Sequence, residues 1–342
     1  MKPLKNIEVI EFSGLGPGPF AAMALADMGA KVTRISRMPA AGTIPKPGQG
    51  SFLNRGRQEI HLDLKTDAGV AQACALVQKA DALIEGFRPG KMESLGLGPD
   101  RLMALNPRLV YGRMTGWGQS GPMAHLAGHD LNFLALSGVL NTLGEADRPP
   151  MPPLNLIGDF GGGGMYLAFG MLSALWQARE TGQGAVVDAA MIHGVTHLAS
   201  FVHGKRAQGA WMDQRESNLV DGGAPFYRCY ETRDGRYMAV GAIEPVFFRT
   251  LLRVLDLEDR FADCQSDRTR WPDMAAAFRA AFAARDLADW SARFDGVDAC
   301  VTPVLTLDEA QNHPQMAACF VDREGGPEPA PAPRLLSRSD AS

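Results

Sequence analysis

The sequence has few cysteines, no excess of basic residues and no long apolar run. Its five cysteines are an odd number, widely scattered and without a C-x-x-C pair, which argues against a disulfide framework or a structural zinc site and favours a reducing compartment. With 34 Lys and Arg against 38 Asp and Glu, the net charge is −4, so nucleic-acid and membrane-surface partners are not expected. The longest apolar stretch, residues 165–176, is too short for a membrane span. The first residues form no signal peptide, and we expect a cytoplasmic globular enzyme or binding protein.

The first half of the chain alternates strand-like and helix-like segments. Strands separated by helices are typical of βαβ units, so an α/β, Rossmann-like parallel sheet is predicted. The expected strands are residues 7–12, 31–36, 59–64, 82–85, 109–114 and 185–188, and the expected helices are residues 20–28, 67–80, 131–142, 162–180 and a helix from 192.

The pattern changes near residue 218, where a second, smaller α+β domain is predicted. Residues 225–243 alternate as a hairpin around Arg233-Asp234-Gly235, a good turn sequence. Two helices are expected after it, at 246–255 and 271–294. From residue 324 the chain is rich in proline, which predicts an extended surface segment and not a packed element.

The turn after the first predicted strand matches the dinucleotide fingerprint G-x-G-x-x-A at Gly16, Gly18 and Ala21. Prolines inside this turn remove backbone donors that a pyrophosphate would need. The second strand is followed by Arg37 where a site for NAD would carry an acidic residue. An arginine there suits a phosphorylated ribose, as in NADP or the 3′-phospho-ADP of coenzyme A. A solvated arginine beside a structural turn is the simpler alternative.

Two further basic residues follow predicted strands. Lys65 comes after the third strand and Arg88 after the fourth. In a doubly wound sheet, ligands bind outside the carboxyl ends of the strands. We therefore expect Arg37, Lys65 and Arg88 to converge on one anion, although each taken alone is explained by solvation.

His129 and Asp159 are the candidate acid–base residues, and each lies at the start of a predicted helix beside glycine. The positive end of a helix dipole favours the neutral imidazole that a general base requires. Four glycines follow Phe160, and we expect them to let a ligand approach the backbone closely. An acidic N-cap is the simpler interpretation of Asp130 or Asp159 alone. His193 and His197 have a zinc-binding spacing, but Gly194 replaces the glutamate of H-E-x-x-H, so an ordinary helix face is favoured and no metal is expected.

Eight motifs along nearly the whole chain carry a specific resemblance. They are GLGPGPFAAM (14–23), LDLK (62–65), RMTGWGQSGP (113–122), GHDLNFLALSGVL (128–140), PLNLIGDFGGG (153–163), GQGAVVDAAM (182–191), DGGAPFY (221–227) and AVGAIEP (239–245). The pattern resembles the family III CoA-transferases, and within that superfamily the alpha-methylacyl-CoA racemases. Transferases of the superfamily usually have a Tyr-Asp pair where this chain has His129-Asp130, which favours a racemase.

The resemblance implies an interlocked homodimer whose active site lies between the large domain of one subunit and the small domain of its partner. It implies a large domain over 1–195 that 320–342 completes, a linker over 196–220, and a small domain with a return linker over 221–319. It implies a racemase that interconverts (R)- and (S)-2-methylacyl-CoA thioesters by 1,1-proton transfer through an enolate, without metal or redox cofactor. His129 and Asp159 would exchange the proton, and Glu244 of the partner would orient His129. The alternative is transfer of CoA between carboxylic acids through an acyl thioester on Asp159. The implied acyl-CoA-binding residues are Arg37, Leu62, Asp63, Leu64, Lys65, Gly86, Phe87, Arg88, Gly128 and Asp130.

Overall fold

The computed structural model describes residues 1–37, 52–323 and 326–337. The chain forms two compact units. The first contains residues 1–139, 153–201 and those from 318 onward, and the second contains residues 140–152 and 202–317.

Six strands of the first unit form one parallel sheet within the described residues, as predicted. Their order, β3-β2-β1-β4-β5-β6, is the doubly wound order that reverses direction between β1 and β4. Each expected strand is present. The bounds of β2 and β4 are as predicted, and the ends of the others shift by one or two residues, or three for β3. The strands are β1 (Glu8–Phe12), β2 (Lys31–Ser36), β3 (Arg57–His61), β4 (Ala82–Glu85), β5 (Val110–Thr115) and β6 (Val186–Ala190).

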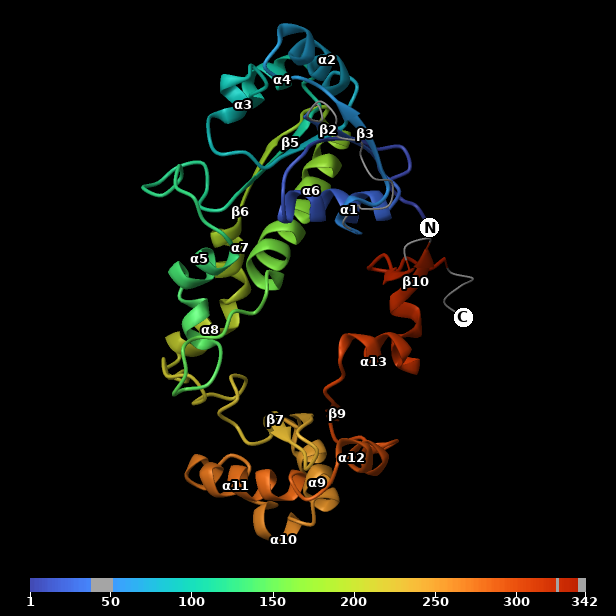
Figure 1. Cartoon of the computed structure of the whole chain (residues 1–342). Helices are drawn as coiled ribbons and strands as arrows, with labels where there is room; N and C mark the ends of the chain where they lie inside the picture. The colour runs from blue at the N-terminus through green and yellow to red at the C-terminus, as the bar shows by residue number, and fades with distance from the viewer. Residues whose placement is uncertain (38–51, 324–325, 338–342) are drawn as a thin grey trace. The chain divides into compact units, whose positions relative to one another are not determined.

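Helices cover both faces of this sheet, because alternate strand residues supply two separate apolar cores. Val9, Ile84 and Val110 face α1 (Pro17–Asp27) and α6 (Tyr166–Thr181). The other face of the strands packs against α2 (Asp67–Val77), α3 (Lys91–Ser94) and α4 (Pro99–Leu105). The result is the three-layer arrangement in the upper part of Figure 1.

The segment after β5 differs from the two long helices predicted there. The first, α5 (Asp130–Leu136), ends early because Gly138 adopts a positive φ of 82°, and a short 3-10 turn (Val139–Thr142) follows. The second begins as a π-helical segment, Leu156–Met165, which continues directly into α6. After β6 come α7 (Met191–Leu198) and α8 (Ser200–Ala207). π-helical segments occur often at functional sites, and this one contains Asp159.

The second unit has the predicted hairpin, β7 (Tyr227–Glu231) and β8 (Tyr237–Gly241), to which β9 (Val301–Pro303) adds an antiparallel third strand. The prediction of one helix over 271–294 is wrong. The chain turns between Phe282 and Leu287, where Arg285 accepts a hydrogen bond from the Arg233 N–H of the hairpin turn at 2.9 Å. The helices of this unit are α9 (Pro245–Val254), α10 (Glu258–Phe261), α11 (Trp271–Phe282), α12 (Leu287–Phe294) and α13 (Leu307–Asn312).

The proline-rich segment near the C-terminus also differs from its prediction. Gly326–Pro329 forms β11, which pairs antiparallel with β10 (Phe320–Arg323). Among the described residues β11 pairs only with β10 and is therefore an edge strand. Proline is tolerated in an edge strand because no second neighbour needs the backbone N–H that proline lacks. Arg55 donates to the Pro329 carbonyl at 2.8 Å and joins the hairpin to the rest of the first unit. Residues 324, 325 and 338–342 of the expected extended segment lie outside the described residues.

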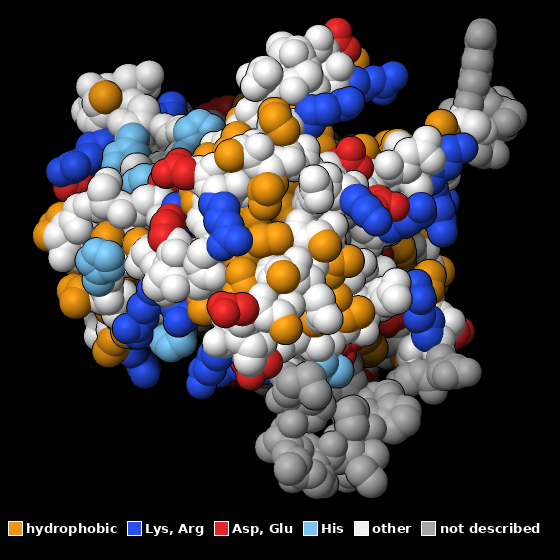
Figure 2. All heavy atoms as spheres, turned by 90° about the horizontal axis from the view of Figure 1, so that it is seen from above, with side chains coloured by type: hydrophobic (Ala, Val, Ile, Leu, Met, Phe, Trp, Pro, Cys, Tyr) orange, Lys and Arg blue, Asp and Glu red, His pale blue; other side chains and the backbone are white. Residues whose placement is uncertain are grey.

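The surface agrees with the small net charge. On the face shown in Figure 2, Lys and Arg side chains lie among acidic ones, with hydrophobic side chains between them. Among the described residues, no helix is both long enough and apolar enough to cross a bilayer.

Candidate active site

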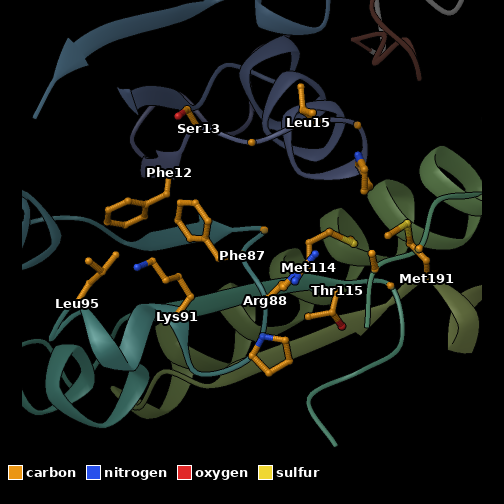
Figure 3. Close-up of a pocket in the computed structure, with 18 of the residues that line it drawn as sticks. Phe12, Ser13, Leu15, Phe87, Arg88, Lys91, Leu95, Met114, Thr115 and Met191 are labelled. Atoms are coloured by element: carbon orange, nitrogen blue, oxygen red, sulfur yellow. The ribbon is translucent and has the colours of Figure 1, made fainter. Parts of the chain in front are cut away.

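A cavity of about 1190 Å³ lies at the carboxyl-terminal edge of the parallel sheet. The loops that follow β1 to β5 all contribute to its lining, because parallel strands end at the same edge. Open α/β sheets bind ligands at the point where the strand order reverses, which here lies between β1 and β4. Figure 3 shows Leu15, from the turn after β1, on one side of the cavity and Arg88 and Lys91, which follow β4, on the other.

Three exposed cations line one part of this cavity. Arg37 follows β2, Lys65 follows β3 and Arg88 follows β4, as the strand pattern predicts. Within the described ranges, none of the three side chains forms an ion pair with a carboxylate. Leu62, Asp63, Leu64, Gly86 and Phe87 line the same cavity. This end of the cavity can therefore bind a polyanion next to apolar surface.

A buried ion-pair network supports the loop after β4. Glu85 is 1% exposed, and its carboxylate accepts hydrogen bonds from the Phe87 N–H at 2.8 Å and from Arg113 Nε at 3.0 Å. Glu93 of α3 contacts the other end of the Arg113 guanidinium at 2.9 Å. The network joins β4, β5 and α3, and so it fixes the backbone that carries Phe87 and Arg88 into the cavity.

His129 and Asp159 line the same cavity. The His129 N–H donates to Asn132 Oδ1 at 3.0 Å, which closes the first turn of α5. Gly128, which also lines the cavity, has no room for a side chain, because a Cβ there would lie 2.8 Å from the Phe133 ring. Asp130 does not line the cavity. It is buried, and its Oδ2 accepts a hydrogen bond from the Asp159 N–H at 2.7 Å.

The surroundings of Asp159 favour its protonated form. Burial raises the pKa of its carboxyl above the ordinary value, and the nearby negative charge of Asp130 adds to this effect. A hydrogen bond from Asn155 and the proximity of His129 lower the pKa, but the net shift is upward. A carboxyl group with a raised pKa next to an imidazole can accept and return a proton closer to neutral pH.

The glycines after Phe160 do not admit a ligand, contrary to the sequence interpretation. Gly162, Gly163 and Gly164 are buried, and none of them lines the cavity. A Cβ on Gly163 would lie 2.8 Å from Met191 of α7 and 3.0 Å from Pro17 of α1. The glycines therefore allow two helices to pack directly on the π-helical segment, which fixes Asp159 from behind.

His193 and His197 have the spacing of zinc ligands, but His197 contacts an aromatic side chain. His197 Nδ1 lies 2.6 Å from the hydroxyl of Tyr166, and the two rings meet edge to face. In the part of the chain that the structure describes, no group of three or more His, Cys, Asp or Glu side chains is arranged to hold a metal ion.

The sequence matches a known family almost from end to end. Residues 4–340 match the family described as CoA-transferase family III. The chain belongs to family III. It is 46% identical to alpha-methylacyl-CoA racemase of Mus musculus over 99% of this chain and 87% of that protein. The Homo sapiens enzyme of the same name is 45% identical, over 98% of this chain and 87% of the human protein. A solved CaiB/BaiF family protein from Brucella suis is 25% identical, covers 97% of this chain and 92% of its own, and superposes with a TM-score of 0.80.

Glu244, the third residue that the family III resemblance implies, lies in the second unit. It directly precedes α9, where its carbonyl accepts the Phe248 N–H at 3.0 Å, and its side chain is exposed. The residues that line the cavity all belong to the first unit, so Glu244 is not among them.

Several cavity residues of this family III chain were not found from the sequence. They share a position just beyond a strand end, which is the signal that could have identified them. Trp117 follows β5 and packs edge to face on Phe133 with ring centroids 4.7 Å apart. Glu85 and Arg113 gave no signal, because their pairing depends on the register between β4 and β5. Ser13, which directly follows β1, is a further lining residue that was missed.

Proposed function

We infer that the protein is an alpha-methylacyl-CoA racemase, an isomerase that interconverts (R)- and (S)-2-methylacyl-CoA thioesters. One observation carries this inference to the site: His129 and Asp159 line a cavity that three cations, Arg37, Lys65 and Arg88, also line. A 1,1-proton transfer needs two titratable groups beside one carbon, and CoA supplies the phosphates that the cations can bind.

We propose that one base removes the α-proton of the bound thioester and the other delivers a proton to the opposite face. The electron pair of the broken C–H bond moves to the carbonyl oxygen and forms an enolate. Reprotonation at carbon restores the thioester with either configuration. His129 takes one face and Asp159 the other. The backbone N–H groups at the start of α5, near Asp130, stabilise the enolate oxygen. The raised pKa of Asp159 brings its proton affinity nearer to that of an imidazole.

The CoA part is bound at the cationic end in this proposal. Arg37 pairs with a phosphate, and Lys65 and Arg88 complete the anionic subsite. Residues 62–65 and 86–88 surround the nucleotide, and the backbone of Gly128 lines the site beside His129. No metal or redox cofactor takes part, because both proton transfers use side chains of the chain itself. We further propose that the enzyme acts in the cytosol, as the sequence predicts.

A homodimer completes the proposed site. One face of α6 exposes an apolar stripe at Met165, Phe169, Leu172 and Trp176, spaced by four, three and four residues. Phe169 is 71% exposed and Trp176 66%, and a helix with an apolar second face is usually covered by another surface. We propose that a second copy of the chain covers it and brings its Glu244 to His129.

The alternative activity is the transfer of CoA between two acids through an acyl thioester on Asp159, which uses the same cavity. The two activities differ in what happens at the α-carbon. The deciding experiment incubates (R)-2-methylacyl-CoA with the enzyme in D₂O. Deuterium at the α-carbon together with inversion of configuration supports the racemase. Transfer of CoA to an added free acid, without α-exchange, would contradict it.

A further inference from the structure

Asp130 is a buried carboxylate between the two proposed bases. Its side chain is 7% exposed, and its Oδ1 has no hydrogen-bond partner among the described residues. A buried carboxylate with an unsatisfied oxygen destabilises a fold, and asparagine would fill the same space without the charge. The charge at this position therefore needs a reason other than stability.

The Oδ2 atom of Asp130 makes a contact that joins two elements distant in the sequence. It accepts the Asp159 N–H at 2.7 Å, across 29 residues, and so connects the first residue of α5 to the π-helical segment. Gly158 makes this contact possible, because a Cβ at position 158 would lie 2.5 Å from Asp130 Oδ2. The contact does not cap α5, because the N–H that Asp130 accepts belongs to the first turn of the π-helical segment.

The same contact sets the relation between the two bases. His129 precedes Asp130 by one peptide bond, and Asp159 carries the bonded N–H. One hydrogen bond thus links the backbone of Asp159 to the side chain of the residue that follows His129. It also places a negative charge beside the Asp159 carboxyl.

We propose that Asp130 is a positioning residue, whose buried carboxylate fixes Asp159 relative to His129 and opposes the ionisation of Asp159. This inference rests on the proposed racemase function. The charged groups that act on Asp159 are Asp130 and His129, and Asn155 donates a hydrogen bond to it. The other elements packed on the segment, α1, α6, α7, β5 and β6, contribute no charge that acts on Asp159 within the described residues.

The test compares Asp130→Asn and Asp130→Ala with the matched control Asp67→Asn. Asp67 is likewise the first residue of a helix, but it is exposed and does not line the cavity. The first readout is the titration of the Asp159 carboxyl by ¹³C NMR, with the signal assigned by its loss in Asp159→Asn. We expect Asp130→Asn to lower this pKa by about half a unit or more, because a like charge is removed, and Asp67→Asn to leave it unchanged.

The second readout is geometric and kinetic. Asp130→Ala removes the acceptor, so the Asp159 amide should exchange with solvent faster, and kcat should fall about 10²-fold with little change in KM. Asp130→Asn keeps an acceptor oxygen and should retain the slow exchange. If Asp130→Ala does not fold, the titration of the asparagine variant still decides.

The outcomes separate this inference from the proposed function. A wild-type enzyme that racemises, combined with an unchanged Asp159 pKa and pH–rate profile in Asp130→Asn, would overturn the role of Asp130 alone. A wild-type enzyme without racemase activity would overturn the proposed function, and the NMR titration would still test the effect of Asp130 on Asp159.

Discussion

The two ends of the cavity are built differently. Arg37, Lys65 and Arg88 are exposed side chains on three separate loops. Asp159, in contrast, lies on a segment that two helices pack against, and its N–H is held by the buried carboxylate of Asp130. A phosphate remote from the reacting carbon needs charge and tolerates small displacements. A proton transfer depends on the position of the reacting groups to within a fraction of an ångström. The comparison therefore predicts that changes at the cationic end alter binding and that changes at the base end alter turnover.

The largest effect is expected at the base end. His129→Ala and Asp159→Asn should each lower the rate of racemisation about 10³-fold or more in both directions, because every inversion uses both groups. The rate is measured by chiral separation of the acyl-CoA product from each enantiomer. Binding of CoA, measured by calorimetry, serves as the control and should be little changed. An effect on one direction only would contradict the shared use of both groups.

At the cationic end, Arg37→Ala should raise KM for the acyl-CoA about tenfold and leave kcat nearly unchanged. The phosphate contact stabilises the ground state and the transition state equally. Arg108→Ala, which removes an exposed arginine that does not line the cavity, is a suitable control. A large fall in kcat with constant KM would show that Arg37 acts at the reacting carbon.

A smaller change in binding is expected from the support behind the cationic end. Glu85→Gln replaces an oxygen that accepts a hydrogen bond by an amide donor, so either the Phe87 N–H or Arg113 Nε loses its partner. We expect KM to rise several-fold with kcat maintained. Glu93 is the more exposed partner of the same arginine, so Glu93→Gln should have less effect. Equal KM values in wild type and Glu85→Gln would show that the loop holds its position without this network.

The smallest effect concerns stability. Because the pKa of Asp159 is raised in the folded state, ionisation of this carboxyl opposes folding. The stability that the protonated Asp159 carboxyl allows is fully present at low pH and is lost as the pH rises through the folded-state pKa. Asp159→Asn should therefore increase Tm at pH 7 by about a degree or more and give no gain near pH 3. Thermal unfolding at the two pH values checks this, and a lower Tm at pH 7 would contradict the raised pKa.

The part of the site predicted from the sequence is the part set by local pattern. The strand positions follow from short apolar runs, and the shared edge of a parallel sheet then brings Arg37, Lys65 and Arg88 to one cavity. The contact between Asp130 and Asp159 could not be predicted, because it depends on how α5 packs against the π-helical segment. The glycines at 162–164 were misread for the same reason, since their sequence does not reveal that helices and not a ligand approach them. The break between Phe282 and Leu287 has no proline or glycine to indicate it.

The most direct test of the central claim is isotope exchange in the two base variants. In D₂O, Asp159→Asn should incorporate α-deuterium into the one enantiomer whose proton faces His129, without inversion. His129→Ala should show the opposite enantiomer preference. This result requires two bases on opposite faces of the α-carbon, each able to act without the other. Equal exchange of both enantiomers in both variants would contradict the two-base account.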